Sequence, residues 1–376
     1  MAQLRGLAWK APLAVEVVPK AELVRRFRSG TERDAHPDRL AGDGETFHLL
    51  HVLPRGYDYE KEVEDLFAGL VLGFYDPKTK ELVVGDPGGE PDPGLKVTIA
   101  HELDHALTDQ WFDFGGRDDT LDAADREEEI DALDALIEGD AKLLETRYAD
   151  TYLTEDEQAA YVLGSLLGTG DDATAARVAQ APPFLLDYLY FPYTEGQKFV
   201  EAQAKGRGNA GVDDAYRHPP TSTEQIIHPD AYRAGVGWSP PQLPDIAAGT
   251  GCQAVRRSTL GEFKMGEVLK SQLGEAATAD ARGWNGDSFQ TVRCGRSLGM
   301  VDRWEADSEA DAARVAQALT RWGGRWARSG AASGGRFSGP GGAGRVVQGG
   351  TRVDLVLGDD AATADRVAAS LGAPAA

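Results

Sequence analysis

The feature that most constrains this chain is the motif His-Glu-Leu-Asp-His at residues 101–105, set inside the apolar, helix-spaced segment 97–111. Residues four apart on a helix lie on the same face, so His101 and His105 can present two imidazole nitrogens to one metal ion. Glu102 lies one step round the helix and can reach a water molecule bound to that metal. Zinc is expected here, because imidazole is a good zinc ligand and an open fourth position leaves room for water. With only seven histidines in the chain, we favour this interpretation over a chance occurrence of the pattern.

A tight catalytic zinc site needs a third protein ligand. The metzincin solution places a glycine and a third histidine three and six residues after the second histidine. Those positions hold Thr108 and Trp111 here, which excludes that solution. A carboxylate from a second helix is the remaining common solution, and residues 122–150 form a long helical pattern. The candidate carboxylates that it offers are Glu127, Glu128, Glu129, Asp131, Asp134, Glu138, Asp140 and Glu145.

Glu138 is the predicted third ligand. It lies in the most apolar part of that helix, 135–141, and a carboxylate is costly to bury unless it is paired or coordinated. The neighbouring Gly139 costs about 1 kcal/mol in a helix interior relative to alanine, which is easier to understand if another backbone, such as the motif helix, packs there. Asp134, one turn earlier, is the fallback ligand or a partner for a histidine. A surface glutamate beside an incidental glycine is the alternative.

The two motifs together resemble those of the gluzincin-type metallopeptidases of bacteria, a poorly characterised group found mostly as secreted proteins or lipoproteins. The likeness extends to residues 5–15, 73–79 and 219–229 and weakly to 260–263 and 283–287, but only the zinc motifs are specific. Asp104 departs from the pattern, because a small hydroxyl residue is expected at that position, which is not a ligand. The resemblance implies a zincin-like peptidase fold and leaves the substrate open.

In the gluzincin scheme, zinc held by His101, His105 and Glu138 lowers the pKa of a bound water, and Glu102 accepts the proton of that water. The oxyanion that forms needs a further hydrogen-bond donor. Tyr193 and His228 are the predicted candidates, because each lies in a downstream segment rich in aromatic or proline-flanked residues. A core position for Tyr193 and a turn cap for His228 are the alternatives.

Two other functions use the same residues. The domain could bind zinc as a scaffold without hydrolysing anything, although a purely structural site has no use for the base Glu102. It could also be a zinc amidohydrolase that acts on a non-peptide amide, which loop lengths and pocket shape would decide. A zinc metallopeptidase with a peptide or protein substrate is the main prediction.

The composition narrows the partners. The net charge is −22, and no cluster of Lys and Arg is present, so nucleic-acid binding is not expected. No run of 18 apolar residues occurs, so no membrane span is expected. Residues 1–12 lack a basic start followed by an apolar core, so the chain as written has no signal peptide. We expect a location outside the cytoplasm if a signal peptide has been removed, and a cytoplasmic one if Met1 is the natural start.

Cys252 and Cys294 are the only cysteines. They can form a disulfide in an oxidising compartment, and two free buried thiols are equally compatible with the sequence.

The predicted fold class is α+β. Residues 1–240 are expected to form a zincin-like domain, with a small sheet and the motif helix followed by a helical bundle. A Pro- and Gly-rich stretch at 235–250 marks a boundary, and 251–376 is predicted as a smaller α+β domain of unknown role. The glycine-dense stretch 331–350 is expected to be a flexible loop. Strands are predicted at 12–18, 70–75, 81–85, 288–295, 298–305 and near 344–357. Helices are predicted at 20–28, 58–70, 155–168, 184–204, 308–322 and 361–371. A further short helix is predicted after Ser222, which with Gln225 forms a capping box.

The hairpin formed by 70–75 and 81–85 precedes the motif helix. Residues 82–85 could serve as a sheet edge to which a peptide adds as an extra strand, with a plain core hairpin as the alternative.

Overall fold

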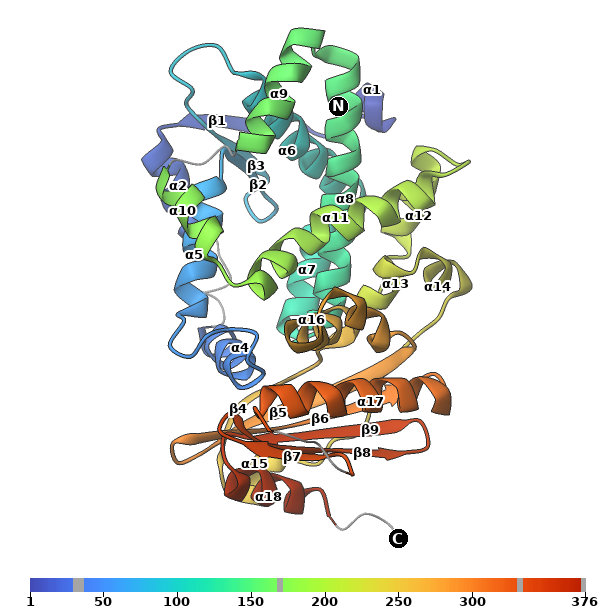
Figure 1. Cartoon of the computed structure of the whole chain (residues 1–376). Coiled ribbons are helices and arrows are strands. Elements are labelled where there is room, and N and C mark those ends of the chain that lie inside the picture. The colour runs from blue at the N-terminus through green and yellow to red at the C-terminus, as the bar shows by residue number, and fades with distance from the viewer. Residues whose placement is uncertain (30–36, 168–171, 330–333, 373–376) are drawn as a thin grey trace.

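The computed structural model describes residues 1–29, 37–167, 172–329 and 334–372, and these residues form a mixed α+β fold (Figure 1). A three-stranded sheet and many helices lie at one end of the molecule, and a six-stranded sheet with its own helices lies at the other. The predicted α+β class is therefore confirmed at this level. Within the described ranges, no helix has both the length and the apolar character needed to cross a membrane.

The small sheet has the strand order β1-β3-β2, with β1 spanning Ala14–Val18, β2 Gly73–Asp76 and β3 Glu81–Gly85. Strand β2 pairs with β3 in antiparallel fashion, which confirms the predicted hairpin, and β1 joins β3 in parallel. Because β3 has a partner on each side, residues 82–85 are not a sheet edge. The prediction that a peptide adds to them is wrong, and the edges of this sheet are β1 and β2.

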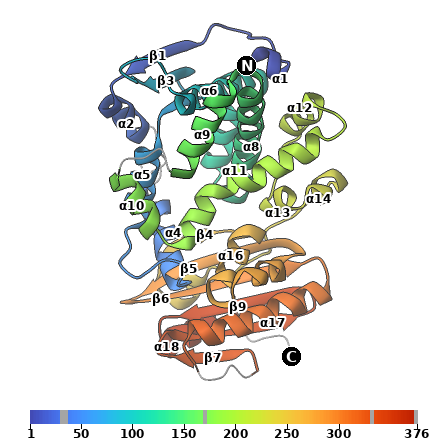
Figure 2. The ribbon, with the colours of Figure 1, turned by 45° about the horizontal axis from the view of Figure 1, so that its top comes forward.

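Three long helices form the centre of the first part: α6 at Pro93–Phe112, α8 at Glu127–Tyr152 and α11 at Pro183–Ala204. Figure 2 shows α6 between the small sheet and α8. The helix predicted at 122–150 begins later, because Asp125 takes a left-handed conformation with φ 55° and separates α8 from the preceding helix. The surrounding helices are α1 Ala2–Arg5, α2 Lys20–Ser29, α4 Pro37–Leu49, α5 Tyr59–Leu70, α7 Phe114–Ala123, α9 Glu155–Leu167, α10 Asp172–Gln180, α12 Asn209–Arg217, α13 Thr223–Ile227 and α14 Pro229–Ala234.

Helices α8 and α11 cross at two glycines. A Cβ atom on Gly139 would lie 2.3 Å from the carbonyl of Gly196, and a Cβ on Gly196 would lie 2.1 Å from the carbonyl oxygen of Ala135. Real Cβ atoms do not approach so closely, so side chains at these positions would force the helices apart. The expected close approach of another backbone to Gly139 is therefore confirmed, but that backbone belongs to α11 and not to the motif helix.

The six-stranded sheet is antiparallel throughout, in the order β4-β5-β6-β9-β8-β7. Helix α17 covers one face of it and α18 lies on the other (Figure 1). The buried rings of Trp284, Trp304 and Trp326 belong to one apolar core that also includes Phe47 and Leu50 near the end of α4, so the two parts of the chain share a core. The elements are α15 Ile246–Thr250, β4 Gln253–Ser258, α16 Gly261–Leu273, η1 Glu275–Ala281, β5 Trp284–Cys294, β6 Ser297–Ala306, α17 Glu309–Trp326, β7 Arg336–Gly339, β8 Gly342–Gly349, β9 Arg352–Gly358 and α18 Ala361–Ser370.

The glycine-dense stretch 331–350 is not the flexible loop that its composition suggested. Residues 331–333 lie outside the described residues, and most of the remainder forms the hairpin of β7 and β8. A Cβ on Gly344 would lie 2.4 Å from the carbonyl oxygen of Val356, and one on Gly342 would lie 2.3 Å from the ring of Trp326. These glycines permit close packing of the sheet.

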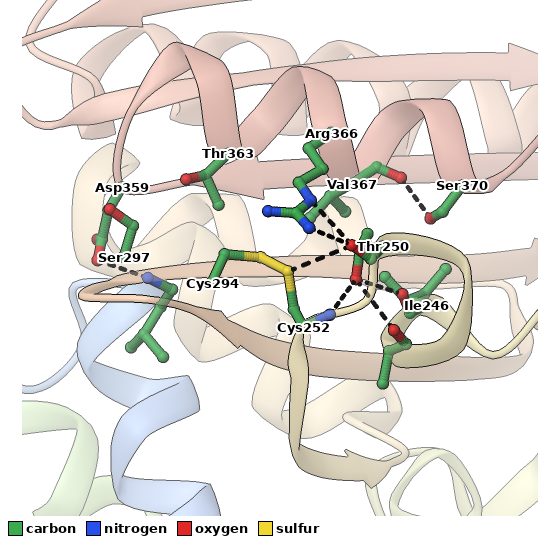
Figure 3. Close-up of a disulfide and its surroundings, with 12 residues drawn as sticks. Ile246, Thr250, Cys252, Cys294, Ser297, Asp359, Thr363, Arg366, Val367 and Ser370 are labelled. Atoms are coloured by element: carbon green, nitrogen blue, oxygen red, sulfur yellow. Dashed lines mark hydrogen bonds between the residues drawn. A yellow bond between two sulfur atoms is a disulfide. The ribbon is translucent and has the colours of Figure 1, made fainter.

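Cys252 and Cys294 form a disulfide that joins the start of β4 to the end of β5 (Figure 3). The adjacent Thr250 carbonyl accepts hydrogen bonds from the guanidinium of Arg366 on α18. With a sequence separation of 42 between the two cysteines, the cross-link stabilises the fold by about 4 kcal/mol in the loop-entropy description. The disulfide thus fixes β4 against β5, next to α18.

Candidate metal centre

Helix α6 positions the motif, and its start follows from local sequence. The Asp92 side chain caps the helix by accepting a hydrogen bond from the Leu95 amide at 2.8 Å, and Pro93 occupies the first turn, where its missing N–H costs nothing. The face that carries His101 and His105 is buried against α8. The histidine side chains are therefore held by the packing of a long, well-capped helix.

Glu138 on α8 lies against both histidines. Its Oε2 atom is 3.0 Å from Nε2 of His101 and 3.6 Å from Nε2 of His105. Two ligands of one tetrahedral zinc ion, each about 2 Å from the metal, lie about 3.3 Å apart. The observed separations bracket that distance, so the three side chains are suited to share one cation. His101, His105 and the adjacent Glu102 also offer ligand atoms that all lie within 4.8 Å of one another.

The electrostatics of these groups favour a bound positive charge. Burial alone would lower the pKa of His101, but hydrogen bonds with Glu138 and Glu145 outweigh it and raise that pKa well above its ordinary value. Burial would likewise raise the pKa of Glu138, but the charge of His105 and the hydrogen bonds with both histidines lower it. These groups thus favour a bound proton, and a metal ion in its place would be held by two imidazole nitrogens and one carboxylate oxygen.

Glu102 is oriented by the small sheet. Its Oε2 atom accepts a hydrogen bond from the backbone amide of Tyr75 in β2, at 2.8 Å. Burial raises the pKa of Glu102, while the charges of the neighbouring histidines act in the opposite direction. One carboxylate oxygen is thereby fixed, and the other remains for a proton.

Glu145, which the sequence alone did not single out, lies behind His101. Its Oε1 atom is 2.8 Å from Nδ1 of His101, and its Oε2 accepts a hydrogen bond from the hydroxyl of Tyr161 on α9 at 3.2 Å. When the proton of the neutral ring is on Nδ1 and directed at Glu145, Nε2 is the nitrogen that remains to bind a metal ion beside Glu138. The available signal was the spacing, since Glu145 follows Glu138 by seven residues and so lies on the same helical face.

Tyr193 is brought to the cluster by α11. Its ring stacks on that of His101 with centroids 6.3 Å apart, and it lies three residues before the crossing glycine Gly196. Burial raises the pKa of Tyr193 well above its ordinary value, and the charges of Glu138, Glu102 and Asp134 add to this effect. The charge of Asp134, the fallback ligand, thus acts on Tyr193, whereas Glu138 is the carboxylate that contacts both histidines.

His228 lies elsewhere. Its Nε2 atom is 2.8 Å from Oε1 of Glu262 on α16, and its charged neighbours are Glu262, Arg282 and Glu224. Helix α13, which ends just before His228, packs on α8, α16 and α11, and α14, which follows His228, packs on α13 and α11. The structure therefore brings Tyr193 to the histidine pair and leaves His228 outside it.

A buried charge network lies beneath the motif. The guanidinium of Arg5 binds Asp140 at 2.9 Å and Asp213 at 2.6 Å, and it lies 4.0 Å from Asp104. Burial and the charge of Asp140 raise the pKa of Asp104 to about 8. Within the described residues, neither carboxylate oxygen of Asp104 has a hydrogen-bond partner. Arg5, which belongs to α1 and is far from the motif in sequence, thus places a positive charge beside Asp104.

The match with a known protein family lies in the C-terminal part of the chain, away from the histidine–glutamate cluster. Residues 250–368 match a domain of unknown function (DUF8575), which here contains the six-stranded sheet and none of the residues of the histidine–glutamate cluster. No curated protein and no solved structure matches the chain. The cluster therefore has to be interpreted from its own geometry.

Proposed function

We propose that this protein is a zinc-dependent metallopeptidase that hydrolyses peptide bonds in a peptide or protein substrate. The observation that carries the proposal is the position of Glu138 Oε2, within 3.6 Å of both histidine Nε2 atoms, with the Glu102 carboxylate on the adjacent residue of α6. Such a set supplies three ligands and a separate base, as hydrolysis by activated water requires.

His101, His105 and Glu138 are the residues that would hold the metal, with Glu145 orienting the ring of His101. Zinc bound there would supply Lewis acidity and lower the pKa of a water molecule toward neutrality. Two imidazole nitrogens and one carboxylate oxygen are a ligand set that zinc prefers.

Glu102 is the proposed general base. With its Oε2 held by the Tyr75 amide, the free oxygen takes the proton of the attacking water as the new C–O bond forms at the substrate carbonyl. Glu102 then delivers that proton to the amide nitrogen as the C–N bond breaks. Burial supports this role, because it raises the pKa of the carboxyl toward that of a proton shuttle.

Tyr193 is the proposed donor to the carbonyl oxygen, on which negative charge develops during the attack. Its raised pKa keeps the hydroxyl protonated at neutral pH, as a donor must be. The edge strand β2 is the proposed seat for an extended substrate, since it both ends the small sheet and supplies the amide that holds Glu102.

The test is the substitution Glu102→Gln, assayed for zinc content and for peptide cleavage. We expect the variant to retain about one zinc per chain and to lose at least about a hundredfold of its activity, because the amide cannot accept the proton. The exposed Glu309→Gln on α17 is the matched control and should behave as the parent protein.

Peptide cleavage that survives in Glu102→Gln would rule out Glu102 as the base. A parent protein that binds zinc but cleaves no member of a peptide library would favour a binding module or a non-peptide amide substrate.

We also propose that the protein works outside the cytoplasm. The Cys252–Cys294 disulfide supports this location, because disulfides persist in oxidising compartments. Protein isolated with thiols blocked should show both cysteines unlabelled by mass spectrometry. Full labelling of both in protein from its native host would contradict the proposal.

A further inference from the structure

A cavity lies at the end of α11, away from the histidine pair. Its volume is 730 Å³, and its wall is formed by the end of α11, the segment 218–225 and the segment 232–237. Gln203 in this wall follows Tyr193 by ten residues on the same helix, which corresponds to about 15 Å along the helix axis. Cavities of this size accept small organic ligands.

The rim of the cavity is positively charged in a protein of net charge −22. Lys205, Arg207 and Arg233 contribute exposed cations, and His218 contributes an imidazole. Among the described residues that line the cavity, none is Asp or Glu. Arg207 and Arg233 each pair with one carboxylate outside the lining, Asp214 and Asp230 respectively, while the ion pairs of the described chain leave Lys205 without an acidic partner.

The wall contains a buried hydrogen-bond donor with no partner. Gln203 is 6% exposed, and its Nε2 amide has no hydrogen-bond acceptor within the described residues. The close approach of Gly211 to the Gln203 carbonyl fixes the backbone there, since a Cβ at residue 211 would lie 2.0 Å from that oxygen. A buried amide N–H is costly without an acceptor, so the Gln203 side chain, whose Nε2 atom is enclosed in the wall, gains a hydrogen bond by turning toward a ligand atom in the cavity that accepts one.

Four backbone carbonyls around the cavity already accept side-chain hydrogen bonds from the chain itself. The Val236 carbonyl accepts from Gln225, the His218 carbonyl from Tyr232, the Thr221 carbonyl from Trp238, and the Ala202 carbonyl from Arg233. The groups left for a ligand are therefore mainly donors and cations. A ligand that complements them offers acceptors and negative charge.

We propose that this cavity binds an oxyanion, the phosphate or carboxylate group of a small ligand. The Gln203 side chain turns its Nε2 amide out of the wall to donate to the oxyanion, and Lys205, Arg207 and Arg233 neutralise it from the rim. The site is independent of the histidine cluster and of the proposed peptidase activity, because it shares no residue with them.

The experiment is a calorimetric titration of the full chain at low ionic strength with inorganic phosphate and, separately, with acetate. Saturable binding of one of them is expected, and the one bound more tightly identifies the ligand group. In the double variant Arg207→Glu/Arg233→Glu, the dissociation constant should rise about tenfold or more. Gln203→Met, which keeps the size and removes the amide, should raise it several-fold.

The matched control is Arg25→Glu/Lys198→Glu. It changes the net charge by the same amount at two exposed cations that also have acidic helical neighbours but do not line the cavity. Its dissociation constant should stay within about twofold of the parent value. Failure of both anions to bind, equal binding by the Arg207/Arg233 variant, or unchanged binding by Gln203→Met in a folded protein would each overturn the assignment.

Discussion

Helix α8 carries two groups of partly or fully buried carboxylates, and they differ in what balances their charge. Toward one end, Glu138 and Glu145 face the imidazoles of α6. At the other end, Glu127 and Asp131 face Arg256 and Lys264 from the second part of the chain, with Lys264 Nζ 2.6 Å from Asp131. One helix thus presents the same chemical group to two kinds of cation.

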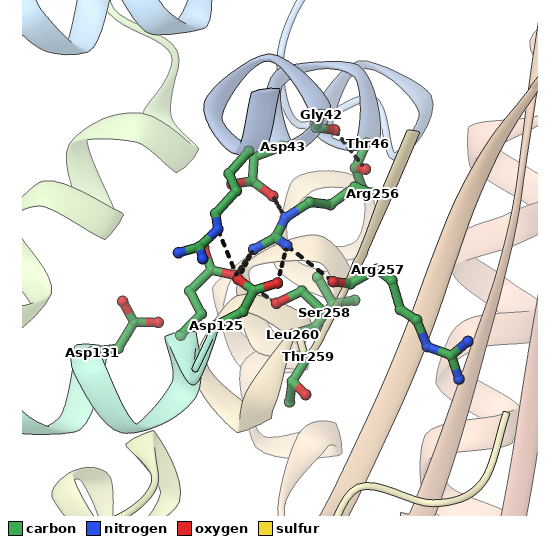
Figure 4. Close-up of polar contacts among 12 residues, drawn as sticks. Gly42, Asp43, Thr46, Asp125, Asp131, Arg256, Arg257, Ser258, Thr259 and Leu260 are labelled. Atoms are coloured by element: carbon green, nitrogen blue, oxygen red, sulfur yellow. Dashed lines mark hydrogen bonds and ion pairs between the residues drawn. The ribbon is translucent and has the colours of Figure 1, made fainter. Parts of the chain in front are cut away.

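Arg256 binds three carboxylates from two other segments of the chain (Figure 4). Its guanidinium contacts Asp43 on α4 at 2.7 Å, Asp125 before α8 at 2.8 Å and Glu127 at 3.2 Å. A guanidinium keeps its proton at any ordinary pH, so these carboxylates are permanently paired and tie the two parts of the chain together. An imidazole can be neutral and offer a lone pair, so Glu138 beside two histidines remains available to a metal. A carboxylate paired with arginine or lysine therefore serves to hold the structure together, whereas one beside neutral imidazoles is a candidate metal ligand, whatever its burial.

The largest effect that tests this comparison is expected from Glu138→Ala. Removing the oxygen that lies against both histidines should weaken zinc binding by on the order of a hundredfold or more, since changing only an indirect partner of a ligand already costs about ten- to a hundredfold. Competition with a fluorescent zinc chelator measures this. Asp134→Ala, on the same helix, is the control and should keep its zinc. Zinc that stays bound to Glu138→Ala at nanomolar free metal would transfer the role to Asp134.

Arg256→Met sharpens the comparison from the other end. It leaves buried carboxylates without their cation and should lower the free energy of unfolding by about 3–5 kcal/mol, with zinc affinity unchanged. Urea denaturation measures the first quantity and chelator competition the second. The exposed neighbour Arg257→Met should cost much less. An equal loss of zinc affinity in Arg256→Met would show that the two groups do not act separately.

The smallest effect is a loss of stability above neutral pH that arises at the histidine end and that bound zinc should remove. In chelator-treated protein, the folded-state pKa of His101 lies above its unfolded value of about 6.5, so this stabilisation is complete below that pH. It is lost as pH rises through the folded-state pKa, at up to about 1.4 kcal/mol per pH unit. Glu138 acts oppositely, because its lowered pKa gives stabilisation above pH 4.5 that is lost at lower pH.

Melting temperatures recorded from pH 5 to 9 test this dependence. The chelator-treated protein should lose stability above neutral pH, and zinc should abolish the loss because the metal takes the place of the proton. Parallel alkaline losses with and without zinc would assign the dependence to other groups.

Much of the local structure could be predicted from sequence. The period of α6 and α8, the cap at Ser222 and the hairpin of β2 and β3 are written in short-range patterns, and the structure confirms them. The approach of Glu138 to the histidine pair also followed from local reasoning, because a carboxylate in an apolar helix segment needs a partner.

What sequence could not supply were contacts between distant residues. The partner of Gly139 is α11, not α6, and the glycines of β8 serve sheet packing, although their composition alone resembles a loop. Arg5 reaches Asp140 across 135 residues, a pairing that no local pattern specifies. His228 was selected for its type and flanking proline, and its neighbours in space decide its role instead.

The glycine crossing of α8 and α11 also determines how α11 can move. Because the two backbones touch at Gly139 and Gly196, any tilt of α11 against α8 would turn about this crossing. Tyr193 lies about 4.5 Å from this crossing along the axis, whereas Pro183 at the far end lies about 20 Å away. A given tilt therefore displaces the end of α11 roughly four times as far as it displaces the hydroxyl-bearing residue. The crossing of α8 and α11 thus holds Tyr193 in place beside the histidine cluster better than it holds the start of α11.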